Sequence, residues 1–142
     1  MQYATQSDLE TRFGTEEILQ LSDPAGSGVV DSQVVSLALS DAQATIDGYL
    51  RAVYTLPLPN VPAELVRVCC DLARFYLYAD RVTDVVQKRR DEAVAWLKDV
   101  AANRTSLALN QAVAAPEKIG AVSFMPGNRV FSAGTLKDFN AA

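Results

Sequence analysis

The sequence predicts a mainly α-helical fold: a compact bundle of four main helices followed by a short C-terminal β-hairpin or an extended tail. Apolar residues recur at spacings of three and four along most of the first hundred positions, the repeat of one helical face. Segments rich in proline, glycine and serine separate these stretches and end the helices. The last residues alternate in polarity around a proline–glycine pair, which is typical of a hairpin.

Length and composition indicate one helical domain with a different C-terminal segment. The chain has 142 residues, of which 49% are hydrophobic, so it can bury a core. We expect a helical domain over residues 1–115 and a tail, either hairpin or extended arm, over residues 116–142. The net charge of -4 argues against a dedicated DNA-binding surface, which is usually basic.

Two short helices are predicted at the start of the chain. Ser7 is placed to cap the first helix, which runs through Phe13, and Glu10 would complete a capping box with it. Thr15 is placed to cap the second helix, Glu16 to Leu21. A loop with strong breaker residues follows.

A long helix is predicted from an N-cap at Asp31 to about Val53. Its apolar stripe is Val35, Leu39, Ala42, Ile46, Tyr49 and Val53. A proline-rich elbow follows, because Pro57 and Pro59 forbid helix there. Leu56 and Leu58 alternate with these prolines, and we expect both to insert into the core.

The third long segment is predicted to be helical from Pro62 to Ala79. Its apolar face is Leu65, Val68, Cys69, Leu72 and Tyr76. Asp71 lies four residues after Arg67 and three before Arg74, so one carboxylate could serve both guanidinium groups. We interpret these three residues as a structural clamp rather than as a catalytic group.

The last predicted helix has its N-cap at Thr83 or Asp84 and runs to about Ala102. Trp96 is expected to anchor it in the core. Its basic run, Lys88 to Arg90, has two readings, a solvated helix face or a local site for nucleic acid, and the acidic balance of the chain favours the first.

The C-terminal segment carries the candidate partner interface. Residues 121–125 and 129–131 flank a turn sequence centred on Pro126 and Gly127. Because a lone two-stranded hairpin is only marginally stable, this segment needs a surface, either its own helices or another chain. The candidate interface residues are Phe124, Arg129, Val130, Phe131, Leu136 and Phe139.

The sequence predicts no enzyme and no catalytic, cofactor-binding or metal-binding residue. It has no histidine, which removes the commonest general base and most transition-metal sites. Adjacent residues on a helix point about 100° apart, so Cys69 and Cys70 do not pair, and we expect both to be buried in a reducing compartment. No leader or membrane-spanning stretch is recognised, so we expect no membrane partner and production in the host cytoplasm.

Several motifs, in order and spacing, resemble those of the small head-tail connector proteins of Mu-like phages and prophages. They are Tyr3-Ala4-Thr5, Asp8-Leu9, Arg12-Phe13-Gly14, Ile46-Asp47, Tyr49-Leu50, Tyr54-Thr55-Leu56-Pro57-Leu58 and Cys70-Asp71-Leu72-Ala73-Arg74. The resemblance runs from Tyr3 to about Leu97 and resumes at residues 129–131. Val53 departs from it, because the family usually has arginine before the elbow tyrosine, and this puts in doubt any salt bridge of that arginine.

The resemblance implies a structural adaptor with no catalytic activity. The resemblance implies that copies of this protein form a closed ring at the capsid–tail junction of the virion. Its partners there would be the portal protein and a tail-side completion protein. It implies no sequence-specific contact with nucleic acid. The alternative is a small cytoplasmic DNA-packaging accessory or regulator that binds nucleic acid through Lys88, Arg89 and Arg90, in a salt-dependent way.

Overall fold

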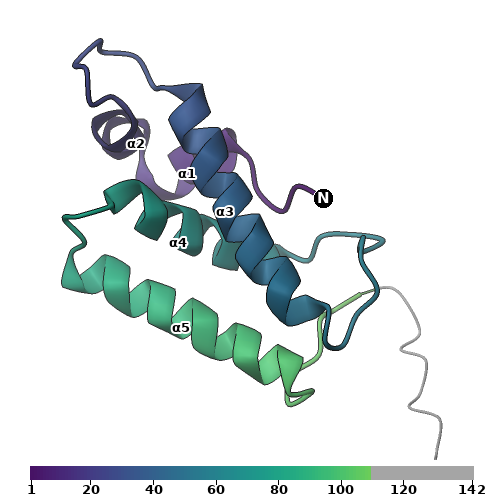
Figure 1. Cartoon of the computed structure of the whole chain (residues 1–142). Helices are drawn as coiled ribbons and strands as arrows, with labels where there is room; N and C mark the ends of the chain where they lie inside the picture. The colour runs from purple at the N-terminus through teal and green to yellow at the C-terminus, as the bar shows by residue number, and fades with distance from the viewer. Residues whose placement is uncertain (110–142) are drawn as a thin grey trace, which may run out of the picture. The chain divides into compact units, whose positions relative to one another are not determined.

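A computed structural model describes residues 1–109, which form five α-helices (Figure 1). They are α1 (Gln6–Phe13), α2 (Thr15–Ser22), α3 (Ser32–Leu50), α4 (Ala63–Tyr78) and α5 (Asp84–Ala101). The predicted mainly helical class is confirmed, but the predicted bundle of four main helices is not, because residues 1–109 form two short and three long helices with no strand. The predicted hairpin and all six candidate interface residues lie outside the described residues. By its contacts the chain divides into Met1–Gln111 and Ala112–Ala142.

Helix α4 is the centre of the body formed by residues 1–109. It contacts each of the other four helices, most extensively α3 and α5, while α1 and α2 cover another of its sides (Figure 1). Half of its positions are buried, among them Leu65, Val68, Leu72 and Ala73 at 0% exposure. None of the helices in this region is long and apolar enough to cross a membrane.

Helix α1 begins earlier than predicted, because a different capping box starts it. The Thr5 side chain accepts a hydrogen bond from the Asp8 backbone N–H at 3.3 Å, and the Asp8 carboxylate accepts one from the Thr5 N–H at 2.8 Å. The predicted cap at Ser7 with Glu10 is therefore wrong. Both pairs have the spacing of a capping box, and the chain uses the first of them.

Gly14 is both the end of α1 and the N-cap of α2, so Thr15 is already helical rather than a cap. Its φ of 90° lies in the region that favours glycine. The residue lets the chain leave one helix and enter the next without a loop. A single residue, Gly14, therefore separates the two short helices.

The predicted caps of α3 and α5 are confirmed, at Asp31 and Thr83. Helix α3 ends at Leu50, before the predicted Val53. There the carbonyl of Leu50 accepts hydrogen bonds from the backbone N–H groups of Val53 at 3.0 Å and Tyr54 at 2.8 Å, which close a turn. The chain therefore turns into the elbow one helical turn early.

The elbow packs on the body as predicted. Leu58 is 4% exposed and Leu56 is partly buried against the core. The Tyr54 hydroxyl accepts a hydrogen bond of 2.9 Å from the backbone N–H of Leu107, which follows α5. Trp96 is also partly buried against this core, in keeping with its predicted role. This hydrogen bond thus joins the elbow to a segment more than fifty residues later in the chain.

Candidate functional site

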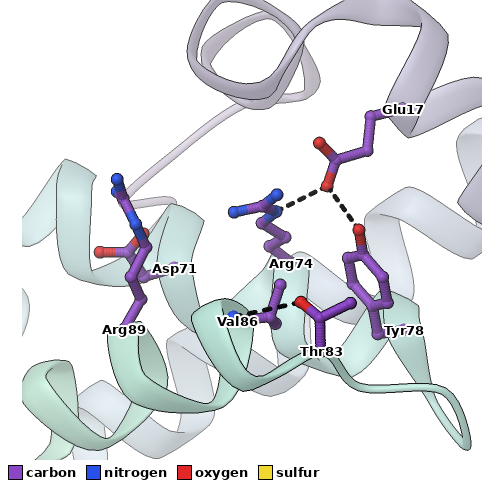
Figure 2. Close-up of polar contacts among 7 residues, drawn as sticks. All are labelled: Glu17, Asp71, Arg74, Tyr78, Thr83, Val86 and Arg89. Atoms are coloured by element: carbon purple, nitrogen blue, oxygen red, sulfur yellow. Dashed lines mark hydrogen bonds and ion pairs between the residues drawn. The ribbon is translucent and has the colours of Figure 1, made fainter.

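A buried carboxylate lies at the junction of α4 and α5. The side chain of Asp71, on α4, is 4% exposed. Two arginine nitrogens approach it. Nη1 of Arg67 lies 3.9 Å from Oδ2. Nη1 of Arg89, on α5, lies 3.8 Å from Oδ1, and Figure 2 shows Arg89 beside Asp71. Both arginine side chains are about half exposed. The two guanidinium groups therefore share one carboxylate at distances near the upper limit of an ion pair.

Burial dominates the protonation of this carboxylate. Loss of water around Asp71 raises the pKa of its carboxyl group above the usual value, while the positive charges of Arg89, Arg67, Arg12 and Arg74 act to lower it. The net direction is upward, so the surrounding arginines offset only part of the desolvation. The ionised form of Asp71 is consequently less favourable in the folded chain than in the unfolded one.

Arg74 takes part in a separate polar group that joins α4 to α2. Its Nε donates to Oε1 of Glu17 at 2.7 Å, and the Tyr78 hydroxyl donates to the same oxygen at 3.0 Å (Figure 2). The Arg74 guanidinium also lies over the Phe13 ring, 4.4 Å from its centre. In the predicted clamp Arg74 was grouped with Asp71. Among the described ion pairs, its direct partner is Glu17 instead.

Replacement of Asp71 by asparagine is expected to stabilise the fold at pH 7. Burial raises the pKa of Asp71 in the folded state. The carboxyl group therefore contributes its full stabilisation at pH values below its unfolded-state pKa, near 4. That stabilisation is lost as the pH rises through the folded-state pKa. Asp71→Asn does not ionise, so its advantage should shrink between pH 7 and pH 3.5 in urea unfolding curves. Asp41→Asn, at an exposed site on α3, is the control. Lower stability of Asp71→Asn at pH 7 would show that the arginine contacts outweigh desolvation.

The two cysteines are buried side by side on α4, as predicted. Cys69 is 1% exposed and Cys70 0%, and both are free thiols. Burial raises the pKa of each thiol to about 12. Because the thiolate is the reactive form, neither side chain is placed to act as a nucleophile or a metal ligand at neutral pH.

These thiols are expected to be unreactive in the native protein. A coloured disulfide reagent at pH 8 should label both cysteines in denaturant and should label the folded protein at least a hundredfold more slowly, limited by opening of the fold. Absorbance against time gives both rates. Rapid labelling of one thiol under native conditions would contradict the burial of α4.

The basic run of α5 contributes to contacts within the body. Arg89 approaches Asp71, and Arg90 forms an ion pair of 3.0 Å with Asp91 while its guanidinium lies 5.2 Å from the centre of the Phe75 ring. Lys88 is exposed. Two of the three residues proposed for nucleic acid are thus engaged with neighbouring side chains. Lys88 and Arg89 are exposed and Arg90 is partly exposed, in keeping with the predicted solvated helix face.

Two polar contacts could not be recognised in the sequence. Glu17 meets Arg74 across 57 positions, and the Tyr3 hydroxyl donates to the Asp47 carboxylate across 44. Tyr3 is 3% exposed, and burial raises its pKa. Both contacts depend on how helices pack rather than on local spacing. The sequence offered one indication of these contacts, the presence of charged residues on otherwise apolar helical faces.

The described residues contain little that suggests bound small molecules. No group of three or more potential metal ligands comes together within residues 1–109. A shallow groove of about 260 Å³ runs between the α2–α3 loop, α3 and the end of α4. Leu37, Asp41 and Tyr76 are among its lining residues. The arrangement is that of a helical body whose charged side chains join its helices.

Comparison with known proteins assigns this small helical protein to the phage and prophage proteins of the Mu type. The chain belongs to the family described as Bacteriophage Mu, Gp36, whose model matches residues 3–125. It is 37% identical over 134 residues to Gene product J of Escherichia phage Mu, covering 93% of this chain and 95% of that protein. It is 32% identical over 137 residues to the Mu-like prophage FluMu protein gp36 of Haemophilus influenzae, covering 96% and 97%.

Proposed function

We propose that this chain is a head-tail connector, a structural protein that forms a ring between the portal protein and a tail-side completion protein. The observation that carries the proposal is membership of a Mu phage family over residues 3–125, together with the connector-like motifs of the elbow and α4. We place the protein at the capsid–tail junction of the virion and, during assembly, in the host cytoplasm. In the proposed ring, the helical body forms the core of each subunit and residues 116–142 act as a docking arm.

The use of polar side chains in the helical body supports a role without catalysis. Arg74, Glu17 and Tyr78 tie α4 to α2, and Arg89 with Asp71 ties α5 to α4. These contacts give the most buried charges partners within the body itself, although for Asp71 they offset only part of the cost of burial. A subunit that must keep its shape under contact from several neighbours needs such internal ties.

Nucleic-acid binding through Lys88, Arg89 and Arg90 has weaker support. Arg89 and Arg90 pair with carboxylates of the same chain, and residues 1–109 contain ten Lys and Arg against fifteen Asp and Glu. A surface for DNA is usually basic overall. We therefore propose that any DNA passing through the ring does so without specific contacts.

Electron microscopy of virions that carry a labelled copy of the protein tests the proposal. The label is expected only at the capsid–tail junction, and a phage lacking the gene should accumulate filled heads and free tails. A label elsewhere on the particle would end the connector proposal, as would complete, infectious particles that lack the protein.

A further inference from the structure

The charges of this chain are segregated along its sequence. Residues 13–50, which form the end of α1, all of α2 and α3 and the loop between them, include no Lys or Arg. The same stretch carries six carboxylates: Glu16, Glu17, Asp23, Asp31, Asp41 and Asp47. Basic side chains of the described residues lie instead on α4, α5 and the segments next to them, apart from Arg12 near the end of α1.

Helix α3 and the loop before it combine some of these carboxylates with exposed apolar side chains. Val29 in the α2–α3 loop is 68% exposed and Leu37 on α3 is 65% exposed, beside the exposed Asp31 and Asp41. We call these four residues the acidic face. The shallow groove of about 260 Å³ lies next to it, since Leu37 and Asp41 form part of its lining.

A second surface has the opposite charge. Arg12, Arg67 and Arg89 are exposed and, with Arg74, surround the single carboxylate of Asp71. Val85 is 62% exposed and lies one helical turn before Arg89 on α5. We call Arg12, Arg67, Val85 and Arg89 the arginine face. Asp71 is shared by these arginines, so their positive charge exceeds the negative charge beneath them.

The two faces lie on different elements, the acidic face on α3 and the loop before it, the arginine face on α1, α4 and α5. The Tyr76 hydroxyl is 2.9 Å from Oγ1 of Thr45, which places α3 on the Tyr76 side of that helix. Asp71 and Arg74 precede Tyr76 by five and two residues, so their side chains point about 140° and about 200° away from it around the helix axis. Two different surfaces of complementary charge allow one copy to bind the next head to tail.

We propose that the arginine face of one copy of this chain docks on the acidic face of the next copy. Val85 then lies against the apolar side chains around Leu37, and Arg67 and Arg89 lie near the carboxylates of Asp31 and Asp41. The inference rests on the proposed function, because a repeated head-to-tail contact of this kind closes a ring when the rotation is right. It deepens that function by assigning the two surfaces that join the subunits.

Cysteine cross-linking in assembled particles tests this pairing. The double variant Leu37→Cys/Val85→Cys keeps every charge and leaves the two native thiols buried. A bismaleimide with a spacer of about 10 Å, similar to the spacing of packed helices, should yield a ladder of covalent species beyond the dimer. Either single variant should stay monomeric, because each position faces the other rather than itself. Leu37→Cys/Ala95→Cys, with an exposed site elsewhere on α5, should give no ladder.

Charge-reversal variants test the electrostatic part of the proposed contact. Arg67→Glu/Arg89→Glu in the cross-linking background should lower the ladder yield at least fivefold, whereas Lys98→Glu at another exposed position of α5 should not. Equal losses in both variants would overturn the proposal. The melting temperature of each purified variant must match that of the parent. If Arg67→Glu/Arg89→Glu does not fold, Arg67→Gln/Arg89→Gln takes its place.

The outcomes separate this inference from the connector proposal. Protein found at the capsid–tail junction with no ladder, or with dimers from a single variant, overturns the pairing and leaves the connector role standing. Protein absent from the junction overturns the connector role. Low-salt binding of duplex DNA that is lost in Arg67→Glu/Arg89→Glu, without any ladder, would assign the arginine face to nucleic acid and overturn the pairing.

Discussion

Deletion of residues 117–142 is expected to leave the helical body folded and, if the protein is the proposed connector, to abolish its assembly into particles. The described core is built from residues 1–109, and the contacts of the chain divide between Gln111 and Ala112. The melting temperature should therefore stay within about 3 °C, the shift that a change of ~0.5 kcal/mol produces in a domain of this size. Helical content by circular dichroism should be unchanged apart from the shorter chain.

The corresponding loss in assembly should be large. Infectious titre should fall by several orders of magnitude when the truncated protein is the only copy, because the proposed docking arm, with Phe124, Phe131 and Phe139, is removed. Substitution of Lys137 by alanine in the full-length chain serves as a control that alters the arm without removing its apolar residues. A truncated protein that melts far lower would show that the tail packs on its own body.

Leu72→Ala is expected to destabilise the fold strongly. Leu72 is fully buried, on the helix that contacts all the others. Truncation of a buried leucine removes apolar area and leaves a cavity, which costs about 2–5 kcal/mol. That range is a large fraction of the stability of a small domain.

Leu37→Ala is the matched control for this substitution. It removes the same atoms from a helical leucine that is 65% exposed, so the change in free energy of unfolding should stay within about 0.5 kcal/mol. Urea unfolding followed by circular dichroism measures both. Similar losses for Leu72→Ala and Leu37→Ala would contradict the position of α4 at the centre of the body.

Local sequence signals predicted the helices well and their first turns less well. The caps at Asp31 and Thr83 follow from side-chain oxygens directly before an apolar repeat, and the structure has both. At the N-terminus two capping boxes overlap, Thr5 with Asp8 and Ser7 with Glu10, and spacing alone does not rank them. Burial decides between them: the start at Thr5 follows directly on the buried Tyr3 and Ala4.

The polar contacts show where local reasoning stops. Helical spacing brings Arg67 and Asp71 together, but it makes Arg74 an equally good neighbour of that carboxylate. Packing of α2 on α4 presents Glu17 to Arg74 instead, and packing of α5 presents Arg89 to Asp71. These contacts join different helices, and no periodicity within one helix encodes the position of another.

The hydrogen bond from the Leu107 N–H to the Tyr54 hydroxyl has a mechanical consequence. It fastens the point at which the backbone departs from α5 to the proline-rich connection between α3 and α4. Tension arriving from later residues is therefore shared among three helices before α5 alone can unwind. In the proposed connector, which joins two large assemblies, this hydrogen bond would spread strain through the body formed by residues 1–109.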